Sequence, residues 1–138
     1  MRLELTRRGD YAIRAMVALT LAAASEPTER IPASRIAETM GIPSRILPSV
    51  MSRLARAGLV DVREGRSGGY LLARPASQIE FLEIVEAIEG DTRRRRCILA
   101  GRPCSDATAC AVHAAFERAQ TSLRSELTRA TLADLGPR

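Results

Sequence analysis

The sequence contains no lysine, so its 21 basic residues are all arginines, and with 16 acidic residues they give a net charge of +5. Arginine binds phosphates and guanine edges through a planar, permanently charged fork, which favours nucleic acid as a partner. An arginine-rich proteome of high GC content would also produce this bias, but not the positions of the arginines along the chain.

Long apolar runs are also missing. No segment approaches the roughly 20 apolar residues of a membrane span, and residues 1–10 lack the apolar segment of a signal peptide. We therefore expect a cytoplasmic protein. Its 138 residues suffice for one domain and an appendage, but not for two independent cores of ordinary size.

Cysteine and histidine are scarce, and all of them lie between positions 97 and 113: Cys97, Cys104, Cys110 and His113. These side chains bind soft and borderline metals. Three cysteines cannot all pair with one another, and a reducing compartment would keep their thiols available for metal. Structural zinc sites usually contain two cysteines about two to four residues apart, whereas the intervals here are six and five residues. Thiolates select iron–sulfur clusters or zinc, and this spacing disfavours zinc; idle cysteines are the alternative.

The first 57 residues predict three helices. Residues 7–24 carry an apolar stripe that follows Thr6, a suitable N-cap, and precedes Pro27. Residues 33–40 predict a second helix that stops at a left-handed Gly41. The third helix is expected over residues 44–57, with Ser44 as its cap. The short connection between the last two helices is typical of a helix-turn-helix.

The third helix separates into an apolar and a cationic face. Its core side is expected to consist of Leu47, Val50, Met51 and Leu54. Its other side contains no acid and consists of Arg45, Ser49, Ser52, Arg53 and Arg56. We expect this side to contact DNA, because a solvated face, the alternative, would normally mix charge signs. Pro48 lacks an N–H and is expected to delay or kink the start of the helix.

Two short strands, over residues 59–63 and 70–74, are predicted around the glycine-rich stretch EGRSGG. A hairpin after a helix-turn-helix predicts a winged helix. Arg63, Arg66 and Arg74 flank or occupy the wing, where they could reach phosphates or the minor groove. A solvated loop is the alternative.

Two further helices are predicted in the second half of the chain. Residues 79–89 should turn Phe81, Leu82, Val85 and Ile88 inward and an acidic row of Glu80, Glu83, Glu86 and Glu89 outward, away from nucleic acid. A basic run, 93–96, follows as a solvated connector. Residues 106–130 predict a long helix with a narrow apolar seam, which we expect to pair with its own copy in a dimer; packing along its own domain is the alternative.

Several segments together resemble the Rrf-two-type winged-helix transcription regulators, the family of IscR-, NsrR- and RirA-like iron–sulfur regulators. They are LTRRGDYAIRAM from Leu5, IAETMGIP from Ile36, LARAGLV from Leu54, GGYLLARP from Gly68, IVEAIEG from Ile84, the three cysteines, and TLADL from Thr131. Each is a weak signal alone, but their order and spacing are specific, and they span nearly the whole chain.

The resemblance implies a mainly α fold, a winged helix-turn-helix with a long C-terminal dimerisation helix. It places a DNA-binding domain at 1–90, a cluster-binding loop at 91–111 and the dimerisation helix at 106–135, with the first helix also at the dimer interface. The expected homodimer would be a regulator, not an enzyme, and would bind palindromic operators in double-stranded DNA as a repressor. The expected DNA-binding residues are Ser44, Arg45, Ser49, Ser52, Arg53, Arg56, Arg63 and Arg66.

The family's recognition-helix contacts fall on Arg45, Ile46 and Pro48. Two departures limit the comparison: a family member has an acidic residue at the position of Pro48, and Glu64 replaces the usual wing arginine. Operator sequences of known members therefore do not transfer to this chain.

The resemblance also implies that Cys97, Cys104 and Cys110 hold an iron–sulfur cluster that senses nitric oxide, redox state or iron supply. His113 lies three residues after Cys110, one helical turn away, and is the expected fourth ligand of a 2Fe–2S cluster. The alternative is Asp10 of the other subunit with a 4Fe–4S cluster, although Asp10 also suits the start of a helix. A cluster-free regulator controlled by a partner protein or small molecule is the second functional hypothesis.

Overall fold

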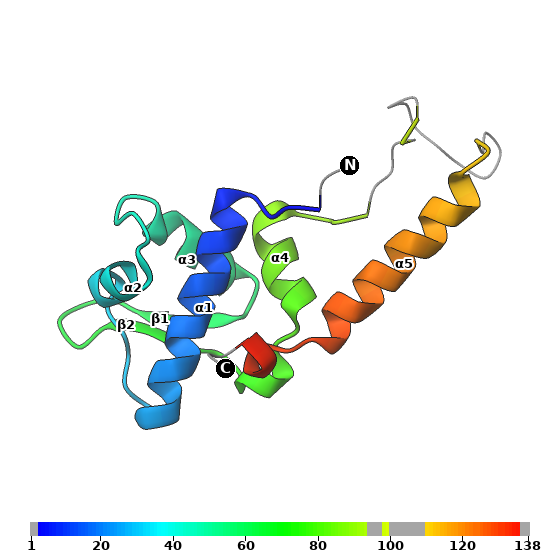
Figure 1. Cartoon of the computed structure of the whole chain (residues 1–138). Coiled ribbons are helices and arrows are strands. Elements are labelled where there is room, and N and C mark those ends of the chain that lie inside the picture. The colour runs from blue at the N-terminus through cyan, green and yellow to red at the C-terminus, as the bar shows by residue number, and fades with distance from the viewer. Residues whose placement is uncertain (1–2, 94–97, 100–109, 136–138) are drawn as a thin grey trace.

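The computed structural model describes residues 3–93, 98–99 and 110–135, and the predicted mainly α fold is confirmed (Figure 1). Its elements are α1 (Arg7–Ser25), α2 (Ala33–Met40), α3 (Leu47–Arg56), β1 (Val60–Arg63), β2 (Gly69–Leu72), the 3-10 turn η1 (Ala76–Gln78), α4 (Phe81–Glu89), α5 (His113–Arg129) and the 3-10 turn η3 (Leu132–Leu135). None of the helices in these ranges is long and apolar enough to cross a membrane.

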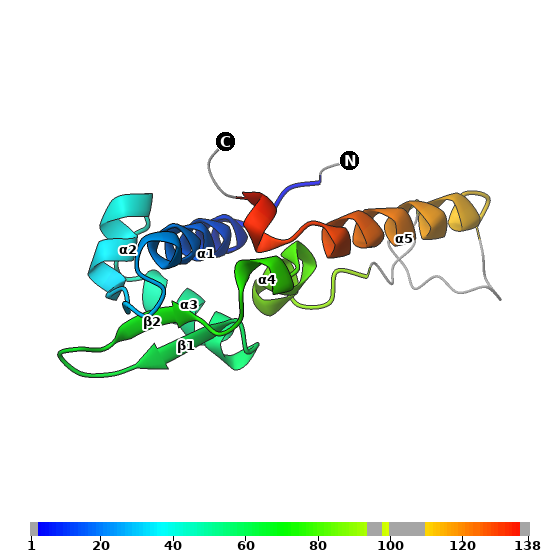
Figure 2. The same cartoon turned by 90° about the horizontal axis from the view of Figure 1, so that it is seen from below.

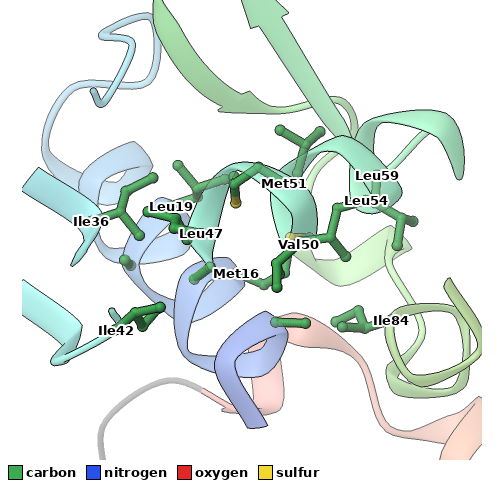
Figure 3. Close-up of a cluster of buried hydrophobic side chains, with 14 of the residues drawn as sticks. Met16, Leu19, Ile36, Ile42, Leu47, Val50, Met51, Leu54, Leu59 and Ile84 are labelled. Carbon is green, nitrogen blue, oxygen red and sulfur yellow. The ribbon is translucent and has the colours of Figure 1, made fainter. Parts of the chain in front are cut away.

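Helix α1 is the central element of the winged helix. The predicted N-cap is confirmed, because the Thr6 hydroxyl accepts a hydrogen bond from the Gly9 amide at 3.2 Å. The helix ends at Ser25, just before Pro27, as expected. Its buried side carries Met16 and Leu19, which meet side chains of α2, α3 and α4 in one apolar core (Figure 3).

Helices α2 and α3 form the predicted helix-turn-helix. Gly41 follows α2 with φ 62°, the left-handed conformation expected of it. Helix α3, however, begins at Leu47, and residues 44–46 form turns, so the prediction that Ser44 caps this helix is wrong. The cause is Pro48, which lacks an N–H and is tolerated only in the first helical turn. The predicted apolar side is confirmed: Leu47, Val50, Met51 and Leu54 are all buried.

The wing is an antiparallel hairpin, slightly shorter than predicted, whose register runs from Val60 opposite Leu72 to Arg63 opposite Gly69. A third segment joins its base, because Ile31 and Tyr70 exchange backbone hydrogen bonds of 3.0 and 2.9 Å. Gly69 has φ 136°, and a β-carbon there would lie 2.7 Å from the Ile31 carbonyl oxygen. A side chain at this position would therefore disrupt the joint between the wing and the helical core.

Helix α4 begins at Phe81, two residues later than predicted, after a reciprocal capping box between Glu80 and Glu83. Leu82, Val85 and Ile88 are buried as expected, but Phe81 is only half-buried, and Ile84, which was not predicted to face the core, is fully buried. Phe81 instead lines a groove together with residues of α5, and its amide donates to the Ala130 carbonyl at the end of that helix at 2.8 Å.

Helix α5 begins at His113, later than the predicted start at 106. Residues 106–109 lie outside the described residues, and 110–112 precede the helix. Both views show α5 extending away from the winged helix on the side opposite the β1–β2 hairpin, with α4 between α1 and α5 (Figures 1 and 2). No α5 residue is buried, whereas Leu132 in η3 returns to the core and is fully buried. Only the end of α5 is thus tied into the hydrophobic core.

Candidate DNA-binding face and metal-ligand segment

The outer side of α3 and the tip of the wing present exposed arginines. Arg45 precedes α3, Arg56 lies in its last turn, and Arg63 and Arg66 lie at the wing. Among the residues that the structure describes, the side chains of Arg45, Arg63 and Arg66 take part in no hydrogen bond or ion pair. Their guanidinium groups are available to phosphates and base edges.

The predicted serines also lie on the exposed side of α3. The Ser49 hydroxyl donates to the Ile46 carbonyl at 2.9 Å, and the Ser52 hydroxyl accepts from Arg56 Nη2 at 3.4 Å. Both bonds are local to one exposed helix, so DNA or water could replace them at small cost. Ser44 is exposed in the turn before α3.

Arg53 has a second role that the sequence did not reveal. Its Nη1 donates to the backbone carbonyl of Ile88, in the last turn of α4, at 2.8 Å. This carbonyl belongs to a helix C-terminus, where a cation is favoured. Arg53 therefore joins α3 to α4, in addition to its predicted place on the DNA-binding face.

Arg74 is also held within the protein. Its guanidinium contacts the Gln78 carbonyl at 2.9 Å and the Glu83 carboxylate at 2.8 Å, which anchors the base of the wing to α4. Burial raises the pKa of Glu83, but hydrogen bonds from Arg74 and the Glu80 backbone outweigh it, and the net pKa is lowered. A role for Arg74 in reaching phosphates would require this ion pair to open.

The metal-ligand segment is described only in part, since Cys97 and Cys104 lie outside the described residues. Cys110 and His113 are adjacent at the start of α5, where the His113 amide donates to the Cys110 carbonyl at 3.0 Å. Asp10, by contrast, forms an ion pair with Arg14 of the same helix at 2.7 Å. Within residues 3–93, 98–99 and 110–135, no group of three or more potential metal ligands comes together.

A polar junction at the end of α4 was not predicted. The Glu86 side chain, expected to point to solvent, accepts hydrogen bonds from Arg124 of α5 and from both the amide and hydroxyl of Thr92, the last two at 3.2 and 2.8 Å. Burial raises the pKa of Glu86, but these donors outweigh it and lower the net pKa. No local pattern signals this junction, because Glu86 and Arg124 are 38 residues apart.

The fold and its arginine-bearing face define a winged-helix transcription regulator. The sequence profile of the Rrf2 family, described as an iron-dependent transcriptional regulator, matches residues 5–138. The chain therefore belongs to the Rrf2 family, as the resemblance predicted, and it is a DNA-binding regulator and not an enzyme.

Two relatives illustrate this similarity at the level of sequence. Protein aau3 of Rhizobium meliloti is 34% identical over 134 residues, which cover 96% of this chain and 84% of the relative. The HTH-type transcriptional regulator IscR of Cronobacter sakazakii is 34% identical over 133 residues, covering 96% and 80%.

Solved structures show the same fold. The global cysteine regulator CymR of B. subtilis superposes with a TM-score of 0.79 at 24% identity, covering 97% of this chain and 96% of that one. IscR of T. potens has a TM-score of 0.72 at 26% identity, covering 96% and 85%.

Proposed function

We propose that the protein is a homodimeric repressor in the cytoplasm that binds palindromic operators and responds to an iron–sulfur cluster. The observation that carries the DNA-binding part is the separation of its arginines into two groups. Arg53 and Arg74 hold elements together, whereas Arg45, Arg63 and Arg66 project from the outer side of the recognition region and the wing without a partner among the described residues. Such exposed, unpaired guanidinium groups suit phosphate and base contacts.

The dimer is supported by α5. This helix buries none of its own residues, and its apolar seam includes the half-buried Phe116 and Leu127 and Leu123, which is 40% exposed. A long helix with so little burial is stabilised mainly by whatever packs on its apolar stripe. A second copy of α5 supplies a matching stripe, and two-fold symmetry would place two recognition helices on two half-sites.

The cluster is supported by the chemistry of the donor set. Three thiolates with one imidazole suit an iron–sulfur cluster, which would supply a centre that changes charge or composition on oxidation or on reaction with nitric oxide. Cys97, Cys104 and Cys110 would hold it. His113 is favoured as the fourth ligand because it is adjacent to Cys110, whereas Asp10 would first have to leave Arg14.

The DNA-binding face is tested by Arg45→Ala. Arg118→Ala is the matched control, because Arg118 is an exposed arginine of α5 far from the recognition region in sequence. Arg45→Ala should weaken operator binding about tenfold and lower the slope of log affinity against log salt concentration by about one. Fluorescence anisotropy across a salt series measures both quantities. Equal affinities of the two variants would remove Arg45 from the interface.

The cluster is tested on protein purified without oxygen, by absorption spectroscopy and by iron and sulfide analysis. We expect bound iron and sulfide in the wild type, loss of both in Cys104→Ala, and a changed spectrum in His113→Ala but not in Asp10→Ala. The reverse pattern would assign the fourth ligand to Asp10. Iron-free wild-type protein, with operator binding unaffected by loss of the cysteines, would instead support the cluster-free regulator.

A further inference from the structure

The junction at the C-terminal end of α4 joins three parts of the molecule. It consists of Glu86 in α4, Thr92 just after it, Arg124 in α5 and Arg53 in α3. We propose that this α4 junction positions the recognition helix relative to α5, so that Arg53, Glu86 and Arg124 set the spacing at which a dimer binds its two half-sites. This inference rests on the proposed homodimer and operator.

In the first part of the junction, Glu86 holds residues 90–92, the segment that follows α4. Gly90 turns the backbone with φ 80°, and Thr92 then folds back so that its amide and hydroxyl both donate to Glu86 Oε1. Residues 93–110, which carry all three cysteines, follow directly in the sequence. A displacement of that segment would therefore pull on Glu86 through Thr92.

The second part attaches α5 to the same carboxylate. Arg124 donates from Nη1 to Glu86 Oε1 and to the Thr92 hydroxyl, and it lies 4.0 Å from the Asp91 carboxylate. The side chains of Arg124 and Glu86 are only 23% and 30% exposed, so water screens this pair less than an ordinary surface ion pair. Each bond is directional, which ties the rotation of α5 to the end of α4.

The apolar contacts between α4 and α5 do not by themselves fix the rotation of α5 relative to α4. The two helices and the N-terminal segment border a groove of about 420 Å³, lined by Phe81, Val85, Leu123 and Leu127 among others. Close-packed side chains would resist sliding, but a gap of this size leaves the facing side chains without part of their contacts. The polar bonds at Arg124, which lines the same groove, hold α5 to the C-terminal end of α4, whereas the Phe81–Ala130 backbone bond joins the two helices at the other end of α4.

The third part connects this fixed point to the recognition helix. Arg53 of α3 donates to the Ile88 carbonyl, two residues from Glu86 in the same helix. The last turn of α4 is therefore bonded to both helices: Glu86 contacts Arg124 of α5, and the Ile88 carbonyl contacts Arg53 of α3. In a dimer built on α5, a change in the angle between α4 and α5 would alter the distance between the two copies of α3.

The experiment compares Arg124→Gln with wild type, using Arg118→Gln as an exposed α5 control and Arg124→Lys as the variant that keeps the charge. The probes are palindromic DNA duplexes selected from a random DNA library for binding to the wild-type protein. Further duplexes have the same half-sites with a spacing that is one base pair longer or shorter. Coupling between sites typically changes affinity about 5- to 150-fold, and we expect Arg124→Gln to reduce the discrimination between spacings to within about twofold. Arg124→Lys should restore part of it, and Arg118→Gln should discriminate like wild type.

Hydrogen exchange of the DNA-free protein provides a second measurement that does not depend on the operator. Arg124→Gln should speed amide exchange in the last turns of α3 as well as in residues 86–92, while α2 remains unchanged. Unchanged exchange in α3, or wild-type discrimination between spacings, would overturn the proposal. Failure of wild type to select any palindrome would contradict the proposed operator, whereas the exchange measurement would still judge the junction.

Discussion

The winged helix and α5 are held in place by different forces. In the winged helix, α1, α3 and α4 bury side chains such as Met16, Leu54 and Ile84 completely in one apolar core. Helix α5 buries none of its residues and is attached by the Arg124–Glu86 ion pair, by the hydrogen bond from the Phe81 amide to the Ala130 carbonyl, and by the turn η3 that follows it. Within one chain, the winged helix is stabilised mainly by removing apolar surface from water, whereas α5 is attached to it mainly by directional polar bonds.

This difference separates what must stay rigid from what can be adjusted. A close-packed core resists small displacements, so it can present the α3 arginines in a constant arrangement. Each polar bond at a partly exposed junction contributes little stability. A small displacement of a neighbouring segment can therefore break such a bond and allow another to form. The sequence position of the cysteines, between the two regions, suits such an adjustment.

The largest expected effect comes from breaking the core of the winged helix. Leu54→Ala should lower the free energy of unfolding by about 2–5 kcal/mol, because it removes a fully buried side chain and leaves a cavity. Leu123→Ala on α5, where the side chain is 40% exposed, should cost less than about 1 kcal/mol under conditions that keep the protein monomeric. Urea unfolding measures both, and similar losses would contradict the contrast between the regions.

A smaller effect is expected at the start of the central helix. Thr6→Ala removes the hydroxyl that accepts the Gly9 amide and should destabilise the protein by about 1 kcal/mol. Thr128→Ala, an exposed threonine in α5, is the control and should have little effect.

Helix α5 has no comparable side-chain cap at Val112, so its first turn should exchange amide hydrogens faster than the first turn of α1. Equal exchange rates in the two turns would remove this distinction.

The smallest effect is the pH dependence contributed by the α4 junction. The pKa of Glu86 is lower in the folded protein than its ordinary value of 4.5, so its contribution to stability is complete above that value and is lost as pH falls through the folded-state pKa. The charged groups that face it are Arg124 and, beyond that arginine, Asp91.

The Glu86→Gln variant should therefore be less stable than wild type at pH 7, by less than about 1 kcal/mol because water still partly screens the pair, and the two should converge below pH 4.5. Glu117→Gln, a change at an exposed α5 residue, is the control. Thermal melting across a pH series measures the difference. A gap between wild type and Glu86→Gln that widened toward low pH would contradict the assignment.

Much of the fold follows from local signals along the chain. The N-cap at Thr6, the stop at Gly41 and the buried side of α3 depend on residues within a few positions of one another, so the sequence alone predicts them. Pro48 also acts locally, and its expected effect on the start of α3 is observed as a delay to Leu47. The exposure of Arg56 was predicted for the same reason, because helical periodicity places it opposite the core, whereas Arg45 lies in the turn before α3 and Arg63 and Arg66 lie at the wing.

The sequence by itself thus determined the winged helix, the family and the cysteine–histidine segment. Only the tertiary structure decided which polar residues face a partner within the protein. Arg53 meets Ile88 35 residues away, and Glu86 meets Arg124 38 residues away. Helical periodicity assigned both Arg53 and Glu86 to outer faces, but it cannot tell a face that meets solvent from one that meets another helix. That distinction depends on how the elements pack, and it places both residues at the α4 junction.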